Sequence, residues 1–267
     1  MRRIAGTRRV GHAGTLDPMA TGLLLLGVNR ATRLLGYLSD KSKTYEATIR
    51  LGSTTITDDA EGEILAQCTA LELAQVSDEQ IIDQIANFRG DIHQRPSSVS
   101  AIKIDGKRSY ARVRAGEVVE LPEREVTIYR YEITSIARTD SYLDIKATVE
   151  CSSGTYIRAL ARDLGSALGV GGHLTSLRRT SIDSFTLDLA KKIGDYETDF
   201  TLMPMVEVAR RVFPVRTITE KERDVLSHGG KLSPNETDAV TAAIFDDSLI
   251  ALIENRLTEA KPVAVFV

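Results

Sequence analysis

The chain has 267 residues, of which 42% are hydrophobic and 27% are charged. Such a composition is sufficient for a hydrophobic core and excludes a disordered chain, so we predict one large folded domain and a small one. No stretch approaches the roughly 18 uninterrupted apolar residues of a membrane span, and no apolar signal core follows the N-terminus. We therefore expect a soluble, cytoplasmic protein.

The formal net charge of −3 hides an uneven distribution. Residues 1–60, 89–130 and 151–192 are each net basic, and the segments between and after them are net acidic. A fold that gathered the basic segments on one face would present a phosphate-binding surface. Ordinary solvated charge is the alternative that this pattern leaves open.

The sequence predicts neither a disulfide framework nor a metal site. Its two cysteines, Cys68 and Cys151, are far apart and outside any Cys-x-x-Cys pair. Its four histidines lack the spacing of metal ligands, and no carboxylate cluster resembles a two-metal site.

The first half of the chain contains three predicted elements. Residues 23–28 form a short apolar run that predicts a buried strand leading into a helix over 31–38. Residues 45–51 alternate in polarity and predict a second strand. A helix begins after Ser77, because Ser77 to Gln80 fits a capping box. The apolar stripe of this helix is predicted to comprise Ile81, Ile82, Ile85 and Phe88.

The second half alternates between strand and helix patterns. Residues 95–122 are basic and read as an excursion from a sheet, followed by an antiparallel pair of strands at 126–136 and 142–150. An amphipathic helix is predicted over 156–168, with Arg158 and Arg162 one turn apart and away from its apolar face. Beyond residue 205 the elements shorten and become strand-like, which indicates a small β-rich domain. The mixed order of strands and helices predicts an α+β fold.

The most unusual stretch is the loop Gly11-His-Ala-Gly-Thr-Leu-Asp-Pro-Met-Ala-Thr-Gly22. Its glycines allow tight turns and close approach of the backbone to a ligand, and Asp17 adds a carboxylate. Pro18 disfavours helical geometry at Asp17 and suits the first position of a helix. A helix N-cap is therefore one interpretation of Asp17.

Two catalytic alternatives fail on this sequence. A Walker A phosphate loop needs Gly-Lys-Ser/Thr, whereas the chain has Gly14-Thr15-Leu16. A glycosidase needs a second carboxylate to activate water, and neither this loop nor residues 151–158 supplies one.

The loop closely resembles the active-site motif of TruB-type tRNA pseudouridine synthases. Three further segments resemble motifs of that family in the same order: Lys43–Gly52, Cys151–Gly165 and His173–Arg179. Residues within 95–122 resemble the thumb insertion with which this family grips the RNA arm. The resemblance covers roughly residues 2–185, and four ordered motifs are far more specific than one.

The resemblance implies a mixed, largely antiparallel pseudouridine-synthase sheet with flanking helices and the thumb. This catalytic domain would span residues 1–205, and a small β-rich, PUA-like domain would follow at 206–267. The sequence lacks the strand and the Lys-Pro-x-Gly segment with which family members normally begin. We expect buried neighbours of that strand to lose contacts and the protein to be less stable.

The resemblance also implies the site residues. Asp17 would be the catalytic carboxylate, Tyr45 would stack on the extruded uracil, and Arg158 would pair with Asp17 and orient it. Further substrate contacts would be His12, Tyr156 and Leu177. Contacts to RNA phosphates would come from Lys103, Lys107, Arg108, Arg178 and Arg179. Taken singly, the local patterns also fit plain packing, a solvated arginine and a locally bonded histidine.

The implied reaction is isomerisation of uridine to pseudouridine at position 55 in the T-loop of tRNA. It involves no redox change and no lost group, so we expect no cofactor and no metal. A carboxylate either attacks C1′ or removes the 2′ proton, and the residues do not separate these routes. The target nucleotide must also leave its stack, which costs a few kcal/mol.

The expected partner is the T-arm of tRNA, bound by a monomer that needs no protein partner. A non-catalytic tRNA-binding or tRNA-folding protein is the alternative, if the missing N-terminal strand disables turnover. A guide-RNA-dependent relative of the dyskerin kind fits less well, because the basic thumb is a feature of the stand-alone enzymes.

Overall fold

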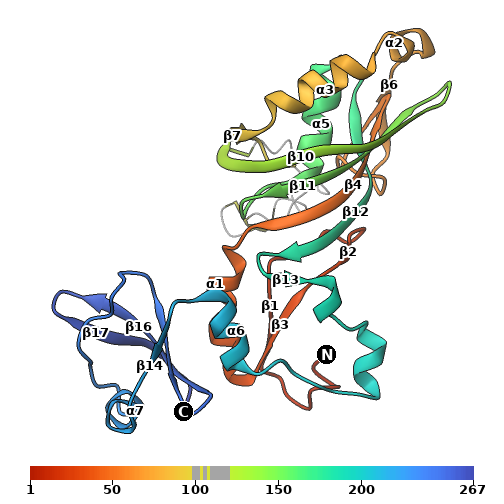
Figure 1. Cartoon of the computed structure of the whole chain (residues 1–267). Helices are drawn as coiled ribbons and strands as arrows, with labels where there is room; N and C mark the ends of the chain where they lie inside the picture. Colours follow the sequence, from red (N-terminus) through yellow and green to blue (C-terminus); the bar gives the residue numbers. More distant parts are fainter. Residues whose placement is uncertain (98–102, 105–106, 109–120) are drawn as a thin grey trace. The chain divides into compact units, whose positions relative to one another are not determined.

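The computed structural model describes residues 1–97, 103–104, 107–108 and 121–267. These residues form two compact units whose segments interleave along the chain (Figure 1). The larger unit comprises residues 15–24 and 39–187, and the smaller unit comprises residues 1–14, 25–38 and 188–267.

A seven-stranded sheet is the framework of the larger unit. Its strand order is β13-β12-β4-β11-β10-β7, with β2 also paired to β12. The pairing of β2 with β12 is parallel, and the other pairings are antiparallel. The strands are β2 (Thr21–Gly22), β4 (Lys43–Leu51), β7 (Gly90–Gln94), β10 (Arg124–Arg138), β11 (Leu143–Cys151), β12 (Gly172–Ile182) and β13 (Phe185–Thr186).

The central strands β4 and β11 owe their place to alternating polarity. Every second residue of each strand is buried, and their register sets Ile49 opposite Ile145. Side chains of alternate residues point to one face of a sheet, so this period of two gives each strand an apolar face. The predicted strand at 45–51 and the predicted antiparallel pair at 126–136 and 142–150 are confirmed.

The described residues of the larger unit form three helices: α2 (Ala70–Ala74), α3 (Asp78–Asn87) and α5 (Ile157–Ala167). The helix α3 begins after the predicted capping box, in which Ser77 Oγ accepts from the Gln80 amide at 3.2 Å. Ile81 and Ile85 are buried, but Ile82 is 53% exposed, so its predicted place in the apolar stripe is wrong. Successive helical residues point about 100° apart, which turns Ile82 away from the face shared by its neighbours.

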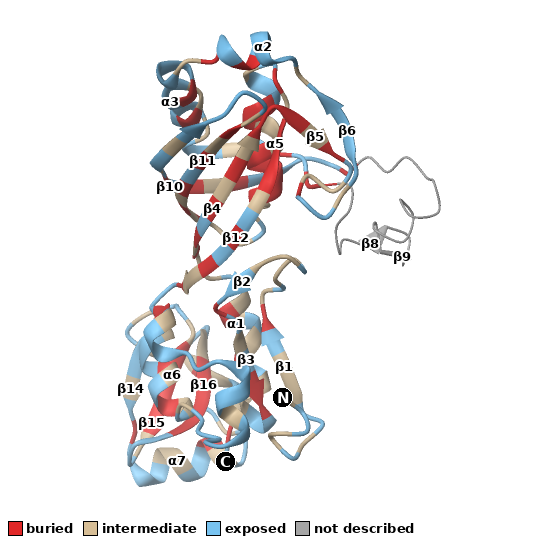
Figure 2. Cartoon of the chain, turned by 90° about the vertical axis from the view of Figure 1, so that its right-hand side faces the viewer, coloured by how far each residue is buried: buried red, intermediate tan, exposed pale blue. Residues whose placement is uncertain are grey.

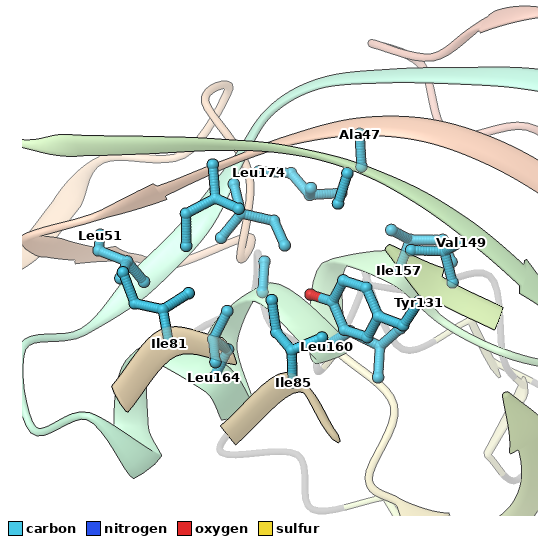
Figure 3. Close-up of a cluster of buried hydrophobic side chains, with 14 of the residues drawn as sticks. Ala47, Leu51, Ile81, Ile85, Tyr131, Val149, Ile157, Leu160, Leu164 and Leu174 are labelled. Carbon is cyan, nitrogen blue, oxygen red and sulfur yellow. The ribbon is translucent and has the colours of Figure 1, made fainter. Parts of the chain in front are cut away.

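The core of the larger unit lies where α3 and α5 pack against the sheet (Figure 3). Leu160 and Leu164 of α5 are fully buried there, and Figure 2 shows the buried residues gathered along the sheet and α5. Tyr131 of β10 is fully buried in the same cluster, and its hydroxyl has no hydrogen-bond partner among the described residues. Burial of apolar surface against the sheet is the main stabilising contribution to this unit.

The described part of the larger unit also contains two hairpins. The strands β5 (Ser53–Thr55) and β6 (Ile64–Gln67) are antiparallel and enclose a loop over residues 56–63. The strands β8 (Lys103–Ile104) and β9 (Lys107–Arg108) form the other hairpin, within the predicted thumb.

The smaller unit contains two sheets. The strands β1 (Val10–Ala13) and β3 (Leu25–Val28) pair antiparallel, and β3 continues into η1 (Asn29–Leu34) and α1 (Leu35–Ser39). The four-stranded sheet has the order β14-β15-β16-β17. Its strands are β14 (Val215–Thr217), β15 (Thr241–Phe245), β16 (Ser248–Arg256) and β17 (Glu259–Val265). The remaining elements are η2 (Leu187–Leu189), η3 (Ile193–Glu197), α6 (Met205–Val212) and α7 (Glu220–Ser227).

The sequence predicted most of the smaller unit's strands and its first helix, but not the helices α6 and α7. The predicted β-rich character of residues 206–267 is confirmed, although α6 and α7 accompany the strands. The helix predicted over 31–38 begins as a 3-10 helix and becomes α-helical at Leu35. The predicted domain boundary between residues 205 and 206 stays a prediction, because the two units follow compactness and divide the chain differently. Throughout the described ranges, no helix has both the length and the apolar character needed to cross a membrane.

Candidate active site

Asp17 lies in the larger unit, in the loop that leads into β2. The Ala20 amide donates to the Asp17 carbonyl at 2.9 Å, so Pro18 and Met19 form a turn. The chain then enters β2 at Thr21 instead of a helix. The interpretation of Asp17 as a helix N-cap is therefore wrong, and its carboxylate is available for another partner.

The far end of this loop is held against β12 by a close main-chain approach. The Leu23 amide donates to the Arg179 carbonyl at 2.8 Å. Gly22 has a φ of +97°, and a Cβ at this position would lie 2.2 Å from that same carbonyl oxygen. Only glycine fits both the conformation and the space, which explains why this position of the motif has no side chain.

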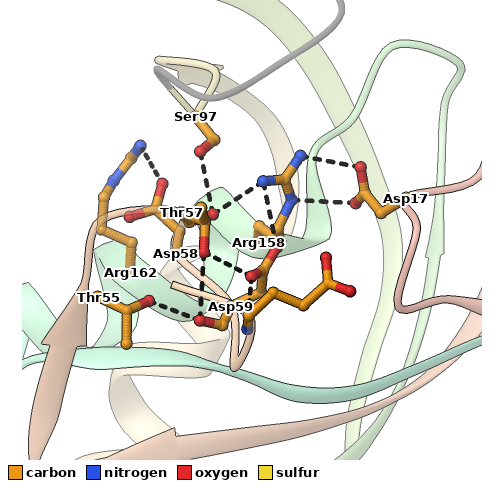
Figure 4. Close-up of polar contacts among 9 residues, drawn as sticks. Asp17, Thr55, Thr57, Asp58, Asp59, Ser97, Arg158 and Arg162 are labelled. Atoms are coloured by element: carbon orange, nitrogen blue, oxygen red, sulfur yellow. Dashed lines mark hydrogen bonds and ion pairs between the residues drawn. The ribbon is translucent and has the colours of Figure 1, made fainter. Parts of the chain in front are cut away.

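The partner of Asp17 is Arg158, at the start of α5 (Figure 4). Arg158 Nε donates to Asp17 Oδ2 at 3.0 Å, and Nη2 donates to Oδ1 at 2.8 Å. The side chain of Arg158 is 5% exposed, whereas that of Asp17 is 29% exposed. Two parallel charge-assisted hydrogen bonds fix the plane of the carboxylate, and its exposed edge remains accessible to a ligand.

The loop between β5 and β6 holds the other side of the guanidinium. Arg158 Nη1 donates to the Thr57 carbonyl at 2.8 Å and lies 3.3 Å from Asp59 Oδ2. Asp59 is itself fixed, because Oδ1 accepts from Thr57 Oγ1 at 2.5 Å and from the Glu61 amide at 3.0 Å. A buried guanidinium placed between two carboxylates is well compensated, since each of its three nitrogens has an acceptor.

Sequence reasoning did not identify Asp59. The only local signal is an acidic pair, Asp58 and Asp59, in a short loop that precedes Gly62. Acidic residues are common in such loops, so this pattern does not point to an arginine about a hundred positions later. The tertiary structure brings the two together.

The side chain of Gln94 holds the main chain at the position where α5 begins. Gln94, buried at the end of β7, accepts from the Tyr156 amide at 2.8 Å and donates to the Tyr156 carbonyl at 3.0 Å. Tyr156 is the N-cap residue of α5, and its side chain is half-buried. Gln94 therefore fixes the residue two positions before Arg158.

Tyr45 and Leu177 lie on β4 and β12 and are 8% and 4% exposed. Burial raises the pKa of the Tyr45 phenol to about 12, Arg179 opposes that rise, and the Asp17 carboxylate adds to it. The charge of Asp17 therefore acts on the Tyr45 phenol, and the predicted contact residues Asp17, Tyr45 and Arg158 belong to one unit.

The prediction that Arg179 contacts RNA phosphates is wrong. Arg179 is 1% exposed, and its Nε donates to the Leu23 carbonyl at 2.8 Å. Inward and outward residues alternate along β12, so the neighbouring Arg178 is exposed and remains a predicted phosphate contact.

The other predicted site residues lie in the smaller unit or outside the described side chains. His12 is exposed on β1 of the smaller unit, opposite Leu26 of β3, and stays a predicted substrate contact. The side chains of Lys103, Lys107 and Arg108 lie outside the described residues. In the part of the chain that the structure describes, no three His, Cys, Asp or Glu side chains are grouped as metal ligands.

Comparison with known families assigns the whole length of the chain. Residues 2–157 match the N-terminal domain of the TruB family pseudouridylate synthases. The chain belongs to the TruB family. Residues 158–207 match the C-terminal domain of tRNA pseudouridylate synthase B, and residues 213–267 match the C-terminal domain of tRNA pseudouridine synthase II.

Curated TruB-family relatives resemble the chain from end to end. It is 52% identical over 278 residues to tRNA pseudouridine synthase B of Paenarthrobacter aurescens (strain TC1), covering 100% of this chain and 88% of the relative. It is 49% identical over 271 residues to tRNA pseudouridine synthase B of Thermobifida fusca (strain YX), covering 100% and 92%.

A solved structure supports the fold of this TruB-family chain. A chain in the crystal structure of a Cbf5-Nop10-Gar1 complex superposes with a TM-score of 0.69 at 25% sequence identity. The match covers 100% of this chain and 77% of that chain. The α+β fold with its mixed, largely antiparallel sheet is thereby confirmed.

Proposed function

We propose that this chain is a tRNA pseudouridine synthase, an isomerase that converts uridine to pseudouridine at position 55 in the T-loop. The observation that carries the proposal is the Asp17 carboxylate, held bidentately by a buried Arg158 and exposed along one edge. The identity of about half of all residues to tRNA pseudouridine synthase B relatives supports tRNA as the substrate.

The reaction requires only that one bond be exchanged for another within the same nucleotide. The bond between N1 of uracil and C1′ of ribose breaks, the base turns, and a bond between C5 and C1′ forms. N1 gains a proton and C5 loses one, so atoms and electrons balance without a cofactor. Asp17 acts on the sugar, either as a nucleophile at C1′ or as a base at the 2′ position.

The residues around Asp17 serve this exchange in different ways. Arg158 orients the carboxylate, so that its reactive edge faces the same direction in every turnover. Tyr45 and Leu177 provide an aromatic ring and an apolar wall that would hold the detached uracil and exclude water. The nucleotide reaches this site only when it is flipped out of its stack, which is easier in a loop than in a duplex.

RNA binding is proposed to use exposed basic residues outside this cluster. Arg178 lies beside Thr21 of β2, at the end of the catalytic loop, where a phosphate of the T-arm would meet it. The thumb residues Lys103, Lys107 and Arg108 would contact the same arm, and His12 would occupy the space that the flipped nucleotide leaves. Contacts of this kind bind the folded shape of the RNA more than its sequence.

We also propose a domain organisation, a cellular location and an oligomeric state for this chain. Residues 1–205 would form the catalytic domain, and residues 206–267 would form a PUA-like domain. The protein would act on tRNA in the cytoplasm as a monomer without a protein partner.

The decisive test is to incubate the full chain with an unmodified tRNA transcript and map pseudouridine by position. We expect product at position 55 with the parent chain, and none with Asp17→Asn or Asp17→Ala although both variants still bind tRNA. Full activity in Asp17→Ala would refute the role of this carboxylate. Tight tRNA binding by the parent chain without product would instead select the non-catalytic alternative.

A further inference from the structure

We propose that Arg162 and Asp58 form a positioning pair for the reaction, which fixes the loop that holds Arg158 and thereby keeps Asp17 in its reactive orientation. This inference rests on the proposed function. Neither residue was predicted as part of the site, and neither contacts Asp17 (Figure 4).

Arg162 lies one turn after Arg158 on α5 and joins three separate segments. Its Nη1 lies 3.3 Å from Asp58 Oδ2, its Nη2 donates to the Arg95 carbonyl at 2.7 Å, and its Nε donates to Asp163 Oδ1 at 2.8 Å. The side chains of Arg162 and Asp58 are 26% and 14% exposed. Two of these nitrogens reach other segments, the β5–β6 loop at Asp58 and the residue after β7 at Arg95, so the half-buried guanidinium restrains both segments relative to α5.

Asp58 lies between the two groups that hold Arg158. The Thr57 carbonyl accepts from Arg158, and the Asp59 carboxylate pairs with it. Asp58 adopts a left-handed conformation with a φ of 58°, which is uncommon for a residue other than glycine, although aspartate tolerates it better than most. Since Asp58 is bonded directly to both neighbours, a change in its backbone would displace the Thr57 carbonyl and the Asp59 carboxylate together.

A second set of contacts ties the same loop to the residues that precede the thumb. Ser97 is fully buried, and its Oγ donates to the Thr57 carbonyl at 3.3 Å. Arg162 donates a hydrogen bond to the carbonyl of Arg95, which lies two residues before Ser97. The Leu174 amide also donates to the Asp58 carbonyl at 3.0 Å, which anchors the main chain of the loop but not its carboxylate.

The charges around Arg158 explain why Arg162 is needed. The guanidiniums of Arg158 and Arg162 are surrounded by four carboxylates, those of Asp17, Asp58, Asp59 and Asp163. Burial raises the pKa of the Asp58 carboxyl, and Arg162 and Arg158 both oppose that rise. Without Arg162, Arg158 is the cation among the described residues whose charge still acts on the Asp58 carboxylate, so Asp58 would compete with Asp17 for it.

The experiment compares Arg162→Gln and Arg162→Lys with the parent chain, using full-length protein and an unmodified tRNA transcript. The readouts are the single-turnover rate of pseudouridine formation, the steady-state KM, the affinity for tRNA and the midpoint of thermal unfolding. Because a displacement of about 1 Å costs on the order of 10²-fold in rate, we expect Arg162→Gln to be slower by about ten- to a hundredfold. Its KM and tRNA affinity should stay close to parental values, and Arg162→Lys should recover part of the rate.

The Arg50–Asp144 pair supplies a matched control. Arg50 donates two hydrogen bonds to Asp144, both at 2.8 Å, and the side chains are 31% and 21% exposed. Arg50 lies five positions after Tyr45 on β4, roughly 16 Å along the strand, and holds no group that contacts Arg158. Arg50→Gln should therefore cost thermal stability to a similar degree and leave the single-turnover rate unchanged.

If Asp58 competes with Asp17 for Arg158, removal of the Asp58 carboxylate should restore part of the rate lost in Arg162→Gln. A merely structural role of Arg162 would not produce this rescue. In the double variant Arg162→Gln with Asp58→Asn, no carboxylate remains at position 58 to draw Arg158 away. The double variant should therefore turn over faster than Arg162→Gln alone, with both measured well below their unfolding temperatures. If Arg162→Gln does not fold, Asp58→Asn alone carries the test, with an expected rate loss of a few-fold at unchanged KM.

Several outcomes would overturn the inference. One is a parental single-turnover rate in Arg162→Gln, or in Asp58→Asn if Arg162→Gln does not fold. Another is a rate loss in Arg162→Gln that is no larger than the loss in Arg50→Gln. A raised KM with an unchanged rate would assign Arg162 to RNA binding, which also contradicts the proposal. Absence of product from the parent chain would indicate failure of the proposed function itself, so the two failures are distinguishable.

Discussion

The helix α5 presents two faces that contribute to the protein in opposite ways. One face carries Leu160 and Leu164, both fully buried in the core against the sheet. The other carries Arg158 and Arg162, which pair with carboxylates from two loops and from α5 itself. Burying a leucine stabilises a fold by about 1.5–3 kcal/mol, whereas desolvation offsets most of the attraction within a buried ion pair. The apolar face of α5 therefore maintains the fold, and the charged face orients Asp17.

The largest expected effect is on the apolar face. Leu160→Ala should lower the free energy of unfolding by about 2–5 kcal/mol, because it removes apolar contacts and leaves a cavity beneath the sheet. Urea denaturation measures this loss. Well below its unfolding temperature, the variant should form pseudouridine at nearly the parental rate. A rate loss much larger than the loss of folded protein would show that the two faces are not separable.

The charged face should show the opposite pattern. Arg158→Lys keeps the charge but cannot form two parallel hydrogen bonds to Asp17, so the single-turnover rate should fall about a hundredfold. That fall corresponds to about 2.7 kcal/mol at the transition state. The midpoint of urea denaturation should fall less than in Leu160→Ala. A parental rate in Arg158→Lys would show that the bidentate geometry is not needed.

The smallest expected effect concerns pH and stability at Asp58. Burial raises the pKa of its carboxyl above the 3.8 of a free aspartate, so the folded protein binds this proton more tightly than the unfolded chain does. The contribution of this carboxyl to folding stability is fully present below a pH of 3.8 and is lost as the pH rises through the raised pKa. Asp58→Asn has no carboxyl at this position, so the variant does not lose stability in this way.

Urea denaturation at a series of pH values between about 4 and 7 measures the effect of Asp58→Asn. The free energy of unfolding of the variant, relative to the parent chain, should become more positive as the pH rises. A difference that stays constant, or that falls with pH, would contradict the burial of an unfavourable charge at this position. Together with the rate loss expected for the same variant, a rise would show that Asp58 serves function at some expense of stability.

Sequence reasoning located the regular elements because each has a local signature. The period of two in β4 and β11, the capping box at Ser77 and the apolar stripe of α5 all lie within short windows of the chain. The error at Ile82 arose from one position of helical phase. The helices α6 and α7 were missed because their short patterns lie among strand-like segments.

The site residues could be predicted from the sequence only where the resemblance to a family named them. The resemblance implies roles for Asp17, Tyr45 and Arg158, and the bidentate pair between Asp17 and Arg158 has the expected form. Asp59 was not found, and Arg179 was assigned to RNA although it is buried. Local sequence did not reveal that successive arginines of β12 point to opposite faces, because that depends on which face the core covers.

The central strands, the helices α3 and α5 and the family could be inferred from the sequence alone, because periodicity and motif order are properties of neighbouring residues. Only the tertiary structure decided which charges meet. Asp17 and Arg158 are 141 positions apart, and Arg162 and Asp58 are 104 apart. Ion pairs over such separations form only after sheet, helix and loop have packed together, and no pattern within a short window encodes them.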